Sequence, residues 1–225
     1  MEQHSIKIIA HIRSDFPTKF GIPRQSGLVP ELRAMVVFEP EFRNPDALRG
    51  IEGFSHLWLI WQFSEAVREE WSPTVRPPRL GGNTRMGVFA TRSPFRPNPI
   101  GLSCVKLEGV RQDAENGSVL YVSGADLMDG TPIYDIKPYL PYADSHPDAH
   151  GGFAPSPKET VAVDCPPALL GKLPQEQRAA LLGVLAQDPR PQYQNDPQRI
   201  YGMRFAGFEV KFRAADGTLH VVEIE

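Results

Sequence analysis

The sequence has only two cysteines, no apolar run long enough to cross a bilayer and no excess of basic residues. Cys104 and Cys165 lie far apart, without a CxxC partner or a histidine at metal-ligand spacing, so neither a disulfide framework nor a bound metal is expected. The first residues lack the apolar core of a signal peptide, which predicts a cytoplasmic protein without membrane association. The net charge of −3 lacks the basic excess of most nucleic-acid-binding proteins.

Several common signatures are also missing. The sequence contains no GxGxxG and no GxxxxGK[ST], and strands do not alternate with helices as in a Rossmann sheet. It contains no GxSxG and no HExxH, so a hydrolase in a barrel mouth has no motif to support it. The usual dinucleotide, nucleotide and hydrolase sites are therefore not expected.

Short β-rich runs separated by turn signals fill the first part of the 225-residue chain. The 23 prolines would break helices almost everywhere before residue 168, except for a short helix expected at residues 64–70. We therefore predict a mainly β chain that folds as a closed or nearly closed β-barrel. The expected strands are residues 6–12, 34–38, 56–63, 86–90, 102–110, 118–122 and 132–136.

The character of the sequence changes after Tyr142, where a small, polar and proline-rich stretch reads as a linker. Beyond it we expect a strand at 159–163, an amphipathic helix at 174–186 and a hairpin formed by 205–212 and 218–224. The predicted organisation is a barrel domain at 1–145, followed by the linker and a small C-terminal α+β domain at 146–225.

A basic band lies between Trp71 and Leu107, where the sequence has no Asp or Glu. Its six positive residues are Arg76, Arg79, Arg85, Arg92, Arg96 and Lys106. Arginine stems often do no more than cover apolar strands and pair with acids elsewhere. The alternative is a surface that faces phosphate, which the planar guanidinium suits better than an ammonium does.

Residues 92–101, RSPFRPNPIG, form the stiffest segment, because three prolines within six residues fix their own φ and restrict their neighbours. Such a loop is either a rigid barrel corner or a pre-ordered ligand site. Asp126, Asp129 and Asp135 precede Lys137 in a second unusual segment. These carboxylates either bond their own turn or face a ribose hydroxyl or a cation such as a sulfonium.

Together these segments resemble, in order, the motifs of the TsaA-like (YaeB or TrmO) family. The matching runs are PRQSGLV at 23–29, EGFSHLWLI at 52–60, residues 76–101, DLMDGTPIYDIKPYLPYADS at 126–145 and, for bacterial members with a C-terminal domain, QDPRPQY at 187–193. The resemblance implies a non-Rossmann β-barrel methyltransferase. Its reaction would move a methyl group from S-adenosylmethionine to N6 of N6-threonylcarbamoyladenosine at position 37 of threonine tRNA. It also implies a homodimer.

The same resemblance implies a set of site residues. The cofactor would contact Pro23, Arg24, Gln25, His56, Leu57, Arg92, Leu102, Asp126, Leu127, Met128 and Asp129. Candidates for a general base are Asp129, Asp126 and His56, in that order, although a histidine at the head of an apolar strand is usually structural. The tRNA anticodon arm would contact Arg76, Arg79, Arg85, Arg96, Arg190 and Tyr193. A non-catalytic S-adenosylmethionine-binding or RNA-binding module is the alternative.

Overall fold

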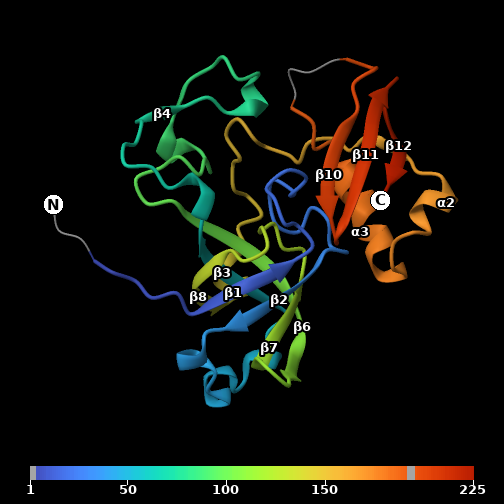
Figure 1. Ribbon diagram of the computed structural model, residues 1–225. Coiled ribbons are helices and arrows are strands. Elements are labelled where there is room, and N and C mark those ends of the chain that lie inside the picture. Colours follow the sequence, from blue (N-terminus) through green and yellow to red (C-terminus); the bar gives the residue numbers. More distant parts are fainter. Residues whose placement is uncertain (1–3, 192–195) are drawn as a thin grey trace.

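The computed structural model describes residues 4–191 and 196–225. Six antiparallel strands form a closed barrel in the order β1-β2-β7-β6-β3-β8 (Figure 1). They are β1 (Ala10–Ser14), β2 (Arg33–Phe38), β3 (His56–Gln62), β6 (Ile100–Asp113), β7 (Gly117–Ser123) and β8 (Pro132–Pro138). The prediction of a mainly β chain is confirmed.

Side chains alternate along the barrel strands, so that one set fills the interior. In β3, Leu57, Leu59 and Trp61 are buried, whereas the residues between them are partly exposed. Because successive residues of a strand point to opposite faces, this pattern places the three side chains inside the barrel. They pack there with inward residues of the other strands, including Ile12 and Val36.

Between β3 and β6 the chain leaves the barrel and forms a separate excursion. Its elements are η4 (Ser64–Ala66), β4 (Thr74–Val75), η5 (Pro78–Leu80), β5 (Met86–Gly87) and η6 (Val88–Ala90). The strand expected at 86–90 is therefore a strand only in its first two residues. The helix expected at 64–70 is wrong beyond Ala66, because this polar segment leaves Val67 exposed and has no apolar face to pack.

A second sheet has the order β10-β11-β12-β9, with β9 parallel to β12. The elements are β9 (Ala162–Asp164), α2 (Pro167–Leu170), α3 (Gln175–Ala186), β10 (Tyr201–Phe205), β11 (Phe208–Ala215) and β12 (Thr218–Ile224). The helix expected at 174–186 is confirmed as α3, which begins after Pro174. The strand expected from residue 205 begins at Phe208 instead, because Ala206 and Gly207 turn the chain between β10 and β11.

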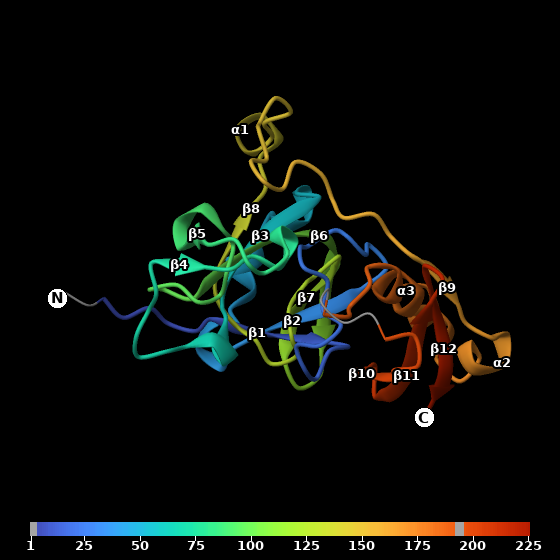
Figure 2. The ribbon, with the colours of Figure 1, turned by 90° about the horizontal axis from the view of Figure 1, so that it is seen from above.

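The remaining short elements lie between the barrel strands and after β8. They are η1 (Pro40–Phe42), η2 (Pro45–Leu48), η3 (Ile51–Gly53) and α1 (Pro141–Asp144). Figure 2 shows α1 standing apart from the barrel, and the chain after it crossing to the side of β9 and α2. Within the described residues, no helix combines the length and the apolar character needed to span a membrane.

The core under the second sheet includes residues from the first part of the chain. Phe205 and Phe212 of the sheet are fully buried in the same cluster as Phe16, Val29 and Leu32. The rings of Phe16 and Phe205 meet edge to face, with centroids 5.4 Å apart. We call residues 15–32, which run from β1 to β2, the bridging loop. This loop joins the barrel to the second sheet.

Candidate functional site

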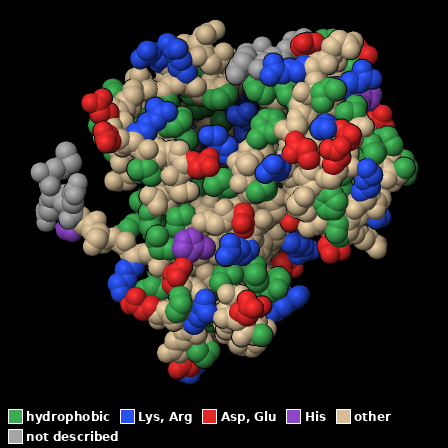
Figure 3. Space-filling model, viewed as in Figure 1, with side chains coloured by type: hydrophobic (Ala, Val, Ile, Leu, Met, Phe, Trp, Pro, Cys, Tyr) green, Lys and Arg blue, Asp and Glu red, His purple; other side chains and the backbone are tan. Residues whose placement is uncertain are grey.

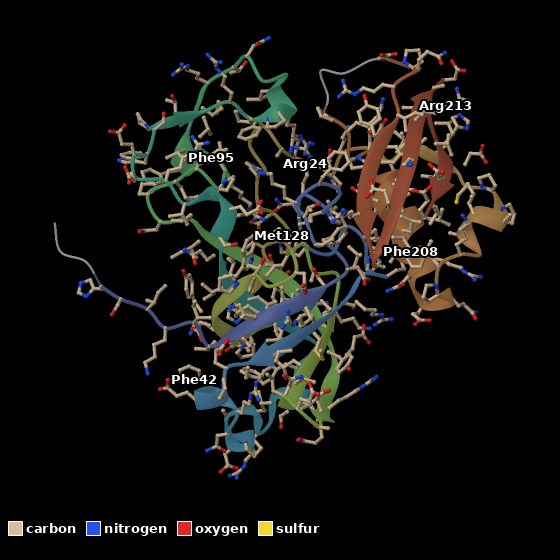
Figure 4. The ribbon with its side chains drawn as sticks, viewed as in Figure 1. Arg24, Phe42, Phe95, Met128, Phe208 and Arg213 are labelled. Atoms are coloured by element: carbon tan, nitrogen blue, oxygen red, sulfur yellow. The ribbon has the colours of Figure 1, made fainter. Side chains whose placement is uncertain are left out.

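The candidate site lies where the excursion, the bridging loop and the second sheet meet beside the barrel. Figure 3 shows a hollow between the excursion and the second sheet, with Lys and Arg side chains along it. In Figure 4, Arg24 lies between these two parts and Met128 lies below it, toward the barrel. Nζ of Lys19 in the bridging loop is 3.6 Å from Oε2 of Glu65 in the excursion, so these two segments are in contact.

Asp126 lies in a hydrogen-bond network at this end of the barrel. The Ser103 hydroxyl donates to Oδ1 of Asp126 at 2.5 Å, and the Ser26 amide also bonds to the carboxyl. Ser103 in turn accepts from Nε1 of Trp61 at 2.9 Å. Burial raises the pKa of Asp126 above its ordinary value, while these hydrogen bonds and the charge of Arg92 oppose the rise. The carboxyl is thus both desolvated and held in place.

Arg92 and the bridging loop approach the same carboxyl. Nη1 of Arg92 donates to the side-chain oxygen of Gln25, and Nε2 of Gln25 donates to the carbonyl of Arg24. The amide of Cys104 donates to Oγ of Ser26 at 3.1 Å. The sequence motifs at 23–27, 92–101 and 126–129 are therefore brought together. We call Gln25, Ser26, Arg92, Ser103 and Asp126 the Asp126 cluster.

Two glycines allow the bridging loop to lie so close to the turn after β7. The amide of Gly27 donates to the carbonyl of Gly124 at 2.8 Å. Gly124 has a φ of +73°, and a Cβ there would be 3.3 Å from the Gly27 backbone. A side chain at Gly124 would be strained and would push the bridging loop away from Asp126.

The other expected cofactor residues occupy different environments. Leu57 and Leu127 are buried in the barrel core, so only their backbones could reach a ligand. Leu102 lies on the outer face of β6 and is 55% exposed. His56 lies on the outer face of β3, where Ser55 Oγ is 3.0 Å from Nδ1 and Tyr139 packs against the ring. Pro23 is buried in the bridging loop.

Asp129, the first candidate for a general base, points toward β1. Its Oδ1 accepts from the amide of Ser14 at 3.0 Å, and its Oδ2 is 3.8 Å from Nη1 of Arg13. These contacts match the structural explanation, in which a turn carboxylate bonds nearby backbone. Asp135 pairs with Lys137 at 2.8 Å. Asp129 and Asp135 thus bond to groups outside the Asp126 cluster.

The arginines of the basic band lie mainly on the excursion. Arg76 and Arg85 are exposed, and Nη1 of Arg85 donates to the Thr74 hydroxyl at 3.2 Å. Arg79, also exposed, donates to the carbonyl of Ser156, and half-buried Arg96 donates to the carbonyl of Thr91.

Near the C-terminus, Arg190 forms two hydrogen bonds to Asp188, at 2.7 and 3.1 Å. Burial alone would raise the pKa of Asp188, but Arg190 and Lys158 bring it below its ordinary value. The guanidinium of Arg190 thus already has an acidic partner. Tyr193 lies outside the described residues.

Sequence reasoning missed three members of the site: Ser26, Trp61 and Ser103. The signal for Ser103 was present, because β6 places Gly101, Ser103 and Val105 on its buried face. A hydroxyl on an otherwise apolar inward face needs a hydrogen-bond partner. Trp61 gives the same signal, since a buried indole N–H also needs an acceptor.

Two family models match the chain. The model described as the tRNA-methyltransferase O N-terminal domain matches residues 11–145, and the TrmO C-terminal domain matches residues 158–225. The chain belongs to the TrmO family. Within the described residues, no group of three or more His, Cys, Asp or Glu side chains could hold a metal ion.

Named relatives of the TrmO family agree with this membership. A tRNA (adenine(37)-N6)-methyltransferase of Escherichia coli K12 is 42% identical, over 100% of this chain and 99% of its own length. An enzyme of the same name from Eikenella corrodens is 52% identical, over 73% of this chain and 93% of its own length. The crystal structure of TrmO from Pseudomonas aeruginosa is 37% identical, covers 100% of both chains and has a TM-score of 0.80.

Proposed function

We propose that this chain methylates N6 of an adenosine in tRNA with S-adenosylmethionine as the methyl donor. The substrate we propose is N6-threonylcarbamoyladenosine at position 37 of threonine tRNA. The observation that carries the proposal is the Asp126 cluster, a desolvated carboxyl held beside Arg92 and the bridging loop. Family membership supports the same reaction class.

The donor set fits S-adenosylmethionine. This molecule carries a sulfonium and an ammonium cation, and a half-buried carboxylate beside them would regain part of the favourable interaction that it loses by leaving water. Gln25 and Arg92 add polar groups for the ribose, the base or the carboxylate. When bound, the donor supplies a methyl group on a positively charged sulfur. Positioning in a water-poor site is then the main task of the protein.

The proposed reaction also needs a proton acceptor. As the N6–C bond forms and the methyl–sulfur bond breaks, N6 loses its proton, and the sulfur becomes a neutral thioether. The carbamoyl group makes the neutral N–H a poor nucleophile but eases removal of this proton. We propose Asp126 as the acceptor, in preference to Asp129 and His56. Of these three, Asp126 is the one that contacts Ser103 and lies beside Arg92 and the bridging loop.

The basic excursion is the proposed surface for the anticodon arm. Arg76, Arg79 and Arg85 are exposed there. Trp71 and Phe89 stack on each other with centroids 6.1 Å apart and remain 52% and 73% exposed. Arginines combined with exposed aromatic rings suit unpaired loop nucleotides, which offer both phosphates and flat bases.

Removing two of these charges should change the salt dependence of tRNA binding. In Arg76→Gln/Arg85→Gln, we expect weaker binding and a slope of log K against log salt reduced by about one for each phosphate that the variant no longer neutralises. Filter binding at several salt concentrations measures the slope. Arg49→Gln is the matched control, because Arg49 is exposed outside the excursion and its guanidinium pairs with Asp46. Lost S-adenosylmethionine affinity with an unchanged tRNA slope would contradict the assignment.

The proposal includes a homodimer and a division of labour between residues 1–145 and 146–225. Ile100 and Leu102 expose 41% and 55% of their surface on the outer face of the barrel, an apolar area that a second copy could cover. Light scattering of the purified chain tests the dimer. In the division of labour, residues 1–145 bind the methyl donor, while residues 146–225 help to enclose the modified nucleotide.

The decisive experiment is nucleoside mass spectrometry of tRNA from cells that lack the gene. Loss of the N6-methyl form of threonylcarbamoyladenosine, with recovery when the gene is restored, supports the proposed reaction. An unchanged nucleoside profile contradicts it and favours the alternative, a non-catalytic binding module. Incubating the purified chain with S-adenosylmethionine and the unmethylated tRNA separates a direct effect from an indirect one.

A further inference from the structure

We propose that Ser103 and Trp61 form a relay of two hydrogen bonds that orients the Asp126 carboxyl and keeps it ionised before methyl transfer. Both are positioning residues that act through Asp126, so the inference rests on the proposed function. Ser103 is 1% exposed and Trp61 is 7% exposed. Neither side chain needs to touch a ligand for the relay to work.

Hydrogen-bond chemistry fixes the direction of the bond between Trp61 and Ser103. An indole N–H can only donate, so the Trp61 ring must give its proton to Oγ of Ser103, at 2.9 Å. The hydroxyl has a single proton, which it donates to Asp126 Oδ1 at 2.5 Å. A hydrogen bond donated to this oxygen favours the ionised form of the carboxyl.

Gly101 explains how the indole is held. It lies opposite Trp61 in the β3–β6 register, and a Cβ at this position would overlap Cε2 of the ring. The Phe63 ring also packs against the indole, with centroids 4.3 Å apart. The amide of Phe63 bonds to the carbonyl of Pro99. The last residues of the stiff segment 92–101 thus support Trp61, while Arg92 at its start contacts Gln25.

The relay opposes the effect of burial. Burial raises the pKa of Asp126, and the Ser103 hydrogen bond lowers it. A base acts when it is ionised, so activity that depends on Asp126 is present above its pKa and is lost as the pH falls through it. Removing the Ser103 hydroxyl raises the pKa further, which moves the acidic limb of the rate profile to higher pH.

The test is the pH dependence of single-turnover methyl transfer to tRNA. In Ser103→Ala we expect the acidic limb to move upward by about one pH unit and the rate at low pH to fall about tenfold. Trp61→Phe, which keeps an aromatic ring but removes the N–H, should move the limb in the same direction by less. Ser103→Thr keeps a hydroxyl and should restore much of the original profile.

A matched control is Ser123→Ala. Ser123 is another buried serine whose hydroxyl donates to a carboxylate, Glu108 Oε1, at 2.7 Å, but it lies outside the Asp126 cluster. Its removal should leave the acidic limb in place. A folded Ser103→Ala or Trp61→Phe protein with the wild-type acidic limb overturns the relay. If wild-type protein transfers no methyl group at any pH, the proposed function itself fails.

Discussion

Asp126→Asn is expected to lower the rate of methyl transfer by about a hundredfold or more, which is the usual contribution of a general base. Asparagine has the shape of aspartate and can still accept from Ser103, but it cannot take the N6 proton. The loss should therefore appear in the single-turnover rate at saturating S-adenosylmethionine and tRNA. Thermal unfolding should show a fold that is at least as stable, because a desolvated charge has been removed.

Asp129→Asn is the control that decides between the two carboxylates. Asp129 accepts from the Ser14 amide and faces Arg13, so its replacement should reduce stability modestly and leave turnover near normal. The opposite pair of results, with normal turnover in Asp126→Asn and lost turnover in Asp129→Asn, would contradict the choice of Asp126. It would restore the order of candidates that the sequence favoured.

Phe16→Ala is expected to destabilise the protein by about 3 to 5 kcal/mol, as is usual when a fully buried phenylalanine is truncated. Phe16 is 1% exposed and packs edge to face on Phe205. The cavity would open between the bridging loop and the second sheet. Because Phe16 lies in the N-terminal part of the sequence, the prediction also implies that residues 146–225 fold poorly alone.

Urea unfolding followed by circular dichroism measures the Phe16→Ala loss. Phe89→Ala is the control: it truncates the same kind of side chain where 73% of it is exposed, and it should change the free energy of unfolding by less than about 0.5 kcal/mol. If Phe16→Ala were as mild as the control, the bridging loop would not anchor the second sheet.

The regular parts of the fold were predictable because they depend on local patterns. Alternation of apolar residues predicted β3, and the apolar face after Pro174 predicted α3. The strand β10 escaped prediction, because its five residues include Gly202 and Arg204 and only two residues separate it from its partner β11. The bridging loop escaped for a different reason. Its apolar residues are buried by a sheet that begins at Ala162, far along the chain, and no local pattern reveals such a contact.

The site was predictable as a set of segments but not as a geometry. Sequence motifs indicated Gln25, Arg92 and Asp126, and the structure brings these residues together. Asp126 and Asp129 are three positions apart in the same motif, so the sequence alone could not tell which carboxylate turns toward the cluster. The fold separates them, because Ser103 bonds to one and the end of β1 bonds to the other.

The bridging loop packs under the second sheet and also contributes residues to the Asp126 cluster. Phe16 and Val29, near its two ends, are buried under the second sheet, while Gln25 and Ser26 lie between them in the Asp126 cluster. A ligand that orders the middle of this loop therefore also restrains its anchors, and the coupling is reciprocal by thermodynamic necessity. Amide hydrogens of β10 and β11 should exchange more slowly with deuterium when the methyl donor is bound. Hydrogen exchange in the second sheet would then report whether the methyl donor is bound beside the barrel.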